Sequence, residues 1–275
     1  MEAIITLKKS YKILIALLSP LAIASIILTI ITINYFNNKK ERIFNIAEAS
    51  YKDLDMTNDF YHYDEIGYKT IIGVDLSEHN KEVDFNKLKE QGIEFAFLRL
   101  GWRGYYEPNL HLDKKFEEYY KGAKKAKMDI GIYFFSQAIN EKEAIEEAEY
   151  VLDILNNRNI DLYIAFDYET IEDSKARTNN LSRSQRTKNA RAFLNKISES
   201  KYDPMLYTNM YWIKYNYEYL LLLDYPVWFA QYSKAPQFKG KHIIWQYATE
   251  MKIDGVSNKD GVDLNLMIKK EDIVN

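Results

Sequence analysis

The chain has 275 residues, 47% of them apolar and 28% charged, so it is long enough for one large folded domain or two small ones. Its net charge of −3 lacks the basic excess typical of proteins that bind nucleic acid, and no nucleic-acid partner is expected. The absence of cysteine excludes disulfides, thiol nucleophiles and cysteine-based zinc sites, and the four histidines show no metal-binding spacing.

The first predicted element is an apolar segment at residues 13–33, which contains no charged residue. As a helix it would extend about 31 Å, enough to cross the hydrocarbon core of a membrane. A cleaved signal peptide is the alternative, with a cleavage site at residues 22–24, but the apolar run continues beyond that point. We therefore predict a transmembrane anchor at 13–33 after a short N-terminus at 1–12. Lysines flank it on both sides, so charge alone does not orient it.

Residues 34–70 are polar without a clear period, and we predict a spacer there. From residue 71 onward, short apolar runs typical of strands recur at 71–76, 94–100, 129–135, 161–168, 204–208, 226–232, 242–247 and 261–264. Helix-like segments alternate with them at 84–91, 112–127, 140–156, 183–199 and 209–222. This alternation indicates a parallel sheet with right-handed crossovers. We predict one α/β domain over 71–275, an irregular, incomplete β/α barrel with eight strands and about five helices.

Polar side chains stand at the ends of these strands, where a β/α barrel has its active site. They are Asp75, Arg99, Asp167, Glu169, Gln231, Gln246 and Asp263. Side chains at i and i+2 of a strand point to the same face, so Asp167 and Glu169 should both enter the barrel mouth. Like charges that close raise the pKa of one carboxyl, which then stays protonated and can act as a general acid beside an ionised partner. Cleavage of a glycosidic bond requires this division of roles.

The residues alone leave other interpretations open. The same acids could hold Mg²⁺ or Ca²⁺ through oxygen ligands, although no calcium-loop spacing or phosphate-binding glycine loop is present. An isolated D-x-E pair also commonly caps a helix or faces solvent. Aromatic residues on the strand ends would either form a platform for sugar rings or fill the barrel, and these are Tyr133, Phe135, Tyr207, Trp228, Tyr232, Trp245 and Tyr247.

Five motifs occur in a specific order: GVDLSEHN at 73–80, FDYE at 166–169, PVWFAQY at 226–232, IIWQYA at 243–248 and DGVDLN at 260–265. Together they closely resemble family 25 glycoside hydrolases, the Chalaropsis-type lysozymes or N-acetylmuramidases of bacteria and phages. The resemblance covers about residues 71–270. One departure is Phe134, where members of the family often carry histidine. Strand alternation turns that side chain away from the mouth.

The resemblance implies a peptidoglycan hydrolase that cleaves the β-1,4 bond between N-acetylmuramic acid and N-acetylglucosamine, without a metal or organic cofactor. By the same resemblance, Glu169 is the general acid and Asp167 stabilises positive charge on the reacting sugar or its acetamido group. Asp75 and Asp263 match the other acids of the family's site. The residues expected to contact the substrate are Tyr133, Phe135, Arg99, Tyr207, Trp228, Gln231, Trp245 and Gln246.

The implied substrate also orients the anchor. Peptidoglycan lies outside the cytoplasmic membrane, so the catalytic domain should face the cell wall and residues 1–12 the cytoplasm. The expected partners are peptidoglycan glycan strands and the membrane itself. A permanent anchor suggests local wall remodelling, for division or for an envelope-spanning assembly. The alternative functions are a membrane-tethered glycan-binding module without turnover and a metal-dependent deacetylase.

Overall fold

The computed structural model describes residues 22, 25–30, 43, 44, 46, 49, 53–63, 65–257 and 259–270. The chain divides into two units, Met1–Ile43 and Phe44–Asn275. In the first unit, residues 22 and 25–30 are helical. Residues 1–12 and most of the anchor predicted at 13–33 lie outside the described residues. In the described part of the chain, no helix is both long enough and apolar enough to cross a membrane.

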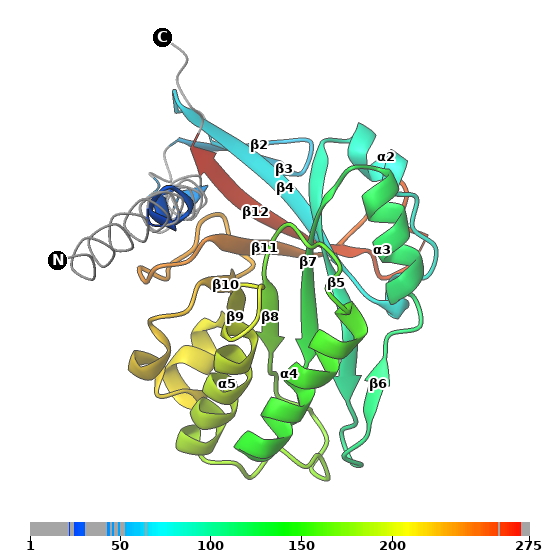
Figure 1. The fold of residues 1–275 in the computed structure, drawn as a ribbon. Helices are drawn as coiled ribbons and strands as arrows, with labels where there is room; N and C mark the ends of the chain where they lie inside the picture. The colour runs from blue at the N-terminus through cyan, green and yellow to red at the C-terminus, as the bar shows by residue number, and fades with distance from the viewer. Residues whose placement is uncertain are drawn as a thin grey trace, which may run out of the picture. The chain divides into compact units, whose positions relative to one another are not determined.

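A closed sheet forms the centre of the second unit (Figure 1). Within residues 65–257 and 259–270 its strands are β4 (Tyr68–Leu76), β5 (Ile93–Arg103), β7 (Asp129–Phe135), β8 (Ile164–Asp167), β9 (Pro204–Asn209), β10 (Val227–Ala230), β11 (Ile244–Met251) and β12 (Val262–Lys270). Neighbours pair in this order, and β12 pairs back with β4. The eight-stranded barrel expected from the sequence is confirmed.

The last barrel strand runs in the opposite direction to the other seven. The pairs from β4 to β11 are parallel, whereas β12 is antiparallel to both β11 and β4. Parallel neighbours need a crossover connection of roughly a dozen residues or more, and the link at 252–261 is too short for one. The sheet therefore closes through a hairpin-like return.

Four α-helices connect the first five barrel strands in the described range 65–257: α2 (Phe85–Glu90), α3 (Phe116–Lys125), α4 (Glu141–Leu155) and α5 (Arg183–Ser198). Asp84, Asn140 and Ser182 cap the first turns of α2, α4 and α5 by accepting hydrogen bonds from backbone N–H groups. Helices α4 and α5 pack side by side on the outside of the barrel (Figure 1). A short 3₁₀ turn, η2 (Glu78–Asn80), follows β4.

The fifth expected helix, at 209–222, is not an α-helix. A π-helix, η3 (Trp212–Asn216), and a 3₁₀ turn, η4 (Tyr219–Leu222), occupy this segment. Its buried apolar residues are Trp212, Tyr217 and Leu222, which recur every five residues. An α-helix repeats every 3.6 residues and cannot place such a set on one face. Tyr217 instead adopts an extended backbone that separates the two short helices.

Four of the described strands were not expected from the sequence. A hairpin of β2 (Leu54–Thr57) and β3 (Phe60–Tyr63) falls within the predicted spacer at 34–70, and a two-residue strand, β1 (Ile43–Phe44), precedes it. The short β6 (Leu110–Leu112) pairs with the end of β5. The ring of Tyr61 lies 5.1 Å from that of Trp245 and 5.0 Å from that of Tyr247. The packed domain therefore begins upstream of residue 71.

Aromatic rings fill the barrel interior. The rings of Phe97 and Trp228 lie 4.5 Å apart, and Trp228 also contacts Tyr207 at 4.8 Å. The space for these rings depends on glycine, because a Cβ atom at Gly131 would lie 2.5 Å from the ring of Phe97. With the interior filled, access for a ligand is confined to the ends of the strands.

Candidate active site

A cavity of about 310 Å³ opens at the carboxyl ends of the parallel barrel strands and at the amino end of β12. Ten of the twelve site residues predicted from the sequence line it: Asp75, Arg99, Tyr133, Phe135, Asp167, Glu169, Tyr207, Trp228, Gln246 and Asp263. The cavity also includes residues that sequence reasoning did not single out: Ser77, His79, Asn80, Glu250, Asp260, Gly261 and Val262. Six of the seven, all but Glu250, lie within the motifs at 73–80 and 260–265, so the motifs marked the segments but not the individual residues.

Two predicted contact residues, Gln231 and Trp245, lie away from the cavity as far as the chain is described. Trp245 is fully buried, and its Nε1 donates to the carbonyl oxygen of Gln231 at 2.8 Å. Successive side chains of a strand alternate between its faces, so Gln246 reaches the cavity while Trp245 packs on the hairpin tyrosine Tyr61. Phe134 is also buried away from the cavity, stacked on Phe193, as expected from alternation.

The first and last barrel strands bring two acids together. Asp75 on β4 and Asp263 on β12 are directly opposite each other in the antiparallel pairing. The Nε2 atom of Gln246 donates to Oδ2 of Asp75 at 2.9 Å and to Oδ2 of Asp263 at 3.4 Å. Asn265 donates to Asp75 Oδ2 at 2.9 Å through its own amide nitrogen.

Both amides are held in the orientation that presents N–H groups to the acids. The hydroxyl of Tyr207 donates to Gln246 Oε1 at 2.9 Å, and Trp228 Nε1 donates to Asn265 Oδ1 at 2.7 Å. Because each amide oxygen is already occupied, each amide nitrogen faces a carboxylate. Asn265 lies in the DGVDLN motif, and only the pairing of β12 with β4 reveals this contact.

The D-x-E motif has the predicted geometry. Asp167 ends β8, and both Asp167 and Glu169 line the cavity. Tyr168 between them points the other way, is buried, and donates through its hydroxyl to the carbonyl of Ala138 at 2.8 Å. Asp167 is 7% exposed, and its Oδ1 atom has no hydrogen-bond partner among the described residues. This buried oxygen therefore lacks a hydrogen-bond donor that would stabilise a negative charge on it.

Burial is the largest cause that raises the pKa of all four carboxyls. Repulsion from Asp263 adds to the effect at Asp75, whose pKa lies well above its ordinary value although Asn265 and Gln246 lower it. At Asp167, repulsion from Glu169 and Asp75 also raises the pKa well above the ordinary value, and Arg99 lowers it. The site therefore holds protons at a pH where ordinary carboxyls are ionised, as general acid catalysis requires.

Arg99 supplies positive charge to this acidic cavity. Its Nε donates to Oδ2 of the buried Asp113 at 2.7 Å, and its guanidinium lies 4.8 Å from the ring centre of Trp102. Asp113 follows β6 as an isolated acid, so its role was not visible in the sequence. In the described part of the chain, no group of three or more His, Asp or Glu side chains is arranged to hold a metal ion.

We expect Asp167→Asn to raise the melting temperature at pH 7. The folded-state pKa of Asp167 is raised, so its favourable contribution to stability is present below the ordinary carboxyl pKa and is lost as the pH rises through the folded value. Asparagine keeps the shape and removes the charge. Thermal unfolding of both proteins between pH 4 and 8 measures the effect. A mutant that unfolds at a lower temperature than the wild type at pH 7 would contradict it.

The family described as Glycosyl hydrolases family 25 matches residues 74–256. An autolytic lysozyme of Clostridium acetobutylicum is 26% identical over 192 residues, which cover 70% of this chain and 54% of that protein. The chain thus spans about half the length of this relative.

Two solved structures share the fold. The spore cortex lytic enzyme SleM of Clostridium perfringens is 26% identical with a TM-score of 0.62, covering 72% of this chain and 67% of that one. The modular autolysin LytC of Streptococcus pneumoniae, solved in complex with a synthetic peptidoglycan ligand, is 19% identical with a TM-score of 0.65. That match covers 78% of this chain and 51% of LytC, and at this identity it supports the fold alone.

Proposed function

The chain belongs to glycosyl hydrolase family 25, and from that membership we propose that it is a peptidoglycan hydrolase of the muramidase type. It cleaves the β-1,4 bond between N-acetylmuramic acid and N-acetylglucosamine. The observation that carries this proposal is the D-x-E pair, whose two carboxyls have raised pKa values and line one cavity with aromatic side chains. The names of the relatives, an autolytic lysozyme and a spore cortex lytic enzyme, are consistent with it.

Glu169 is the proton donor to the glycosidic oxygen. Burial raises its pKa, so it carries a proton when ordinary glutamates are ionised. The pKa of Asp167 is also raised, and two such neighbours titrate as a pair rather than as independent groups. Positive charge that develops on the sugar next to the unpartnered Oδ1 of Asp167 favours its ionised form, which leaves the shared proton on Glu169.

The other residues of the cavity orient the substrate and the acids. Asp75 and Asp263, joined through Gln246, form the opposite acidic wall. Of the side chains expected from the sequence to contact the glycan, we propose the six that line the cavity: Arg99, Tyr133, Phe135, Tyr207, Trp228 and Gln246. Gln231 and Trp245 are not included, because both lie away from the cavity among the described residues.

Residues 13–33 are proposed to anchor the chain in the cytoplasmic membrane, with the catalytic domain on the cell-wall side. The uncharged apolar run supports the anchor, and the position of peptidoglycan outside the membrane supports the orientation. In this arrangement the enzyme remodels the wall close to the membrane, and its partners are glycan strands and, as one candidate, an envelope-spanning assembly.

One experiment tests both proposals by comparing the full chain with residues 44–275, the second structural unit. We expect both proteins to release muropeptides from purified peptidoglycan with reducing ends at muramic acid, as identified by mass spectrometry. The full chain should sediment with membranes and the fragment should stay in the supernatant. EDTA should leave the activity unchanged.

Each alternative gives a different result in the same experiment. Reducing ends at glucosamine would overturn the proposed bond. Binding to walls without release of reducing sugar would favour a glycan-binding module. Loss of activity with EDTA, with free acetate among the products, would favour a deacetylase. A full chain that does not sediment with membranes would contradict the anchor alone.

A further inference from the structure

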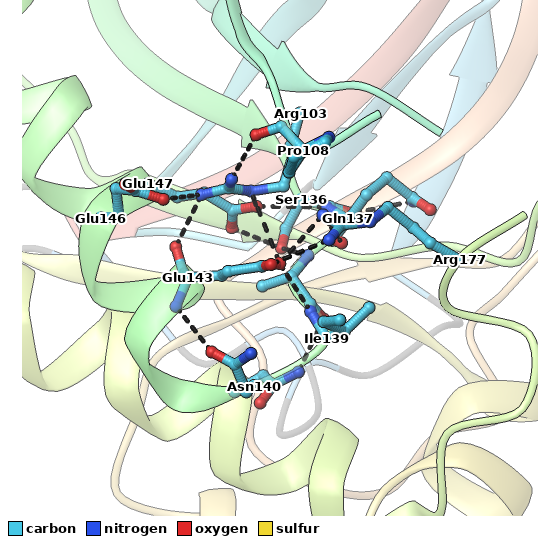
Figure 2. Close-up of polar contacts among 12 residues, drawn as sticks. Arg103, Pro108, Ser136, Gln137, Ile139, Asn140, Glu143, Glu146, Glu147 and Arg177 are labelled. Atoms are coloured by element: carbon cyan, nitrogen blue, oxygen red, sulfur yellow. Dashed lines mark hydrogen bonds and ion pairs between the residues drawn. The ribbon is translucent and has the colours of Figure 1, made fainter. Parts of the chain in front are cut away.

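A buried polar cluster lies next to the strand ends that carry the D-x-E acids. We call it the Arg103 cluster; it consists of Arg103, Ser136, Gln137, Glu143, Glu147 and Arg177 (Figure 2). Arg103 is 1% exposed and Glu147 is fully buried, and their Nε and Oε1 atoms are 2.7 Å apart. Glu147 does not line the cavity as far as the chain is described, so it cannot touch a substrate there.

Net stability does not explain this ion pair. Removing two charges from water offsets most of their attraction, and apolar residues of similar volume are often at least as stable. The ion pair instead fixes the position of the Glu147 carboxylate. While Arg103 holds one side of the Glu147 carboxylate, its oxygens accept hydrogen bonds from the turn after β7, from Ser136 Oγ at 2.6 Å and from the Gln137 backbone N–H at 3.3 Å.

The same turn holds the backbone of the D-x-E motif. The backbone N–H of Ser136 donates to the carbonyl of Asp167 at 2.7 Å. The hydroxyl of Tyr168 donates to the carbonyl of Ala138 at 2.8 Å, and Asn189 on α5 donates to the same oxygen at 2.7 Å. The Asp167 carbonyl and the Tyr168 side chain between the two acids are therefore both fixed to residues 136–138.

The segment after Glu169 is tied to the cluster as well. Arg177 forms an ion pair with Glu143 at 2.8 Å and donates to the carbonyl of Gln137 at 3.3 Å. Thr178 donates to the side-chain oxygen of Gln137 at 2.9 Å. The turn that Glu147 holds thus bonds both to the D-x-E motif, at Asp167 and Tyr168, and to residues 177–178 further along the chain.

We propose that Glu147, with Arg103 as its counter-ion, is a positioning residue that fixes the turn at 136–138 and through it the orientation of Asp167 and Glu169. This inference rests on the proposed hydrolase function for its activity readout. Its structural readout is independent of that function.

The activity test uses the full chain with Glu147→Gln and Ser136→Ala. Displacement of reacting groups by about 1 Å can cost 100-fold in rate, so we expect kcat on purified peptidoglycan to fall by about 10- to 100-fold. KM should stay within about twofold, because the side chains proposed to bind the glycan are unchanged. Glu146→Ala is the matched control. Glu146 bonds to the same guanidinium at 2.9 Å but, among the described contacts, makes none with the turn, so it should keep wild-type kcat.

Hydrogen exchange measured by mass spectrometry tests the link directly. We expect Glu147→Gln to speed exchange in peptides that cover 130–140 and 163–170, with the rest of the domain unchanged and Glu146→Ala like the wild type. Faster exchange over the whole domain would mean general destabilisation and would overturn the proposal. If Glu147→Gln does not fold, Ser136→Ala supplies the same readouts with the ion pair intact.

The two proposals fail in distinguishable ways. A wild-type chain that releases no sugar defeats the proposed function, while localised exchange would still support the positioning role. An active wild type, together with Glu147→Gln and Ser136→Ala that keep both normal kcat and normal exchange, defeats the positioning role alone.

Discussion

Glu169→Gln is expected to lower kcat for the release of muropeptides by roughly 100- to 10,000-fold, the usual contribution of a general acid. Glutamine has nearly the same shape but cannot donate the proton to the leaving oxygen. Because burial raises the pKa of Glu169, loss of its ionisable group should not destabilise the fold. Release of reducing sugar from purified peptidoglycan measures the rate, and thermal unfolding checks the fold.

The matched control is Glu172→Gln, three residues further along the chain. Glu172 is exposed and does not line the cavity among the described residues. We expect this variant to retain wild-type activity. Near-normal activity of Glu169→Gln would show that another group donates the proton, and Asp167 would be the next carboxyl to test.

The second large effect is on stability. Trp245→Ala should lower the free energy of unfolding by about 3–5 kcal/mol, because a fully buried indole leaves a cavity when it is removed. The substitution also removes the packing on Tyr61 and Tyr247 and the hydrogen bond to the Gln231 carbonyl. Urea-induced unfolding measures the loss.

The milder variants Trp245→Phe and Trp228→Phe separate packing from substrate contact. Trp245→Phe should lower stability and leave KM unchanged, because its ring lies in the core. Trp228 lines the cavity and orients Asn265, so Trp228→Phe should impair catalysis. An increase in KM for Trp245→Phe at unchanged stability would show that this ring contacts the glycan after all.

The sequence was sufficient to predict the barrel, because its strands contain short apolar runs bounded by polar residues. The sequence did not reveal that β12 is antiparallel. A strand that closes a barrel can have apolar residues on both faces, and this pattern is the same for either strand direction. The hairpin of β2 and β3 is only weakly indicated by the sequence, through its turn residues. Asn58 and Asp59 form its turn with positive φ, a pair of residue types that favours such turns. A polar surrounding sequence obscured it.

The acids were predictable and their supporting groups were not. Period-2 alternation places Asp167 and Glu169 on one face from the sequence alone. The contact between Asn265 and Asp75 joins residues 190 positions apart, and only the sheet register brings them together. For the same reason the sequence could not separate Trp245 from Trp228: both are tryptophans on strands, and their roles depend on which face of the barrel each one occupies.

The pairing of β4 with β12 has a consequence for when the acidic cavity forms during synthesis. Asp75 lies on the first barrel strand to leave the ribosome, and Asp263 and Asn265 lie on the last. During synthesis, a chain that has folded up to β11 still lacks Asp263 and Asn265, the part of the acidic wall that β12 supplies beside Asp75. The acidic cavity is complete only when the final strand has returned to the first. We therefore expect the proposed hydrolytic activity only from a chain that includes β12.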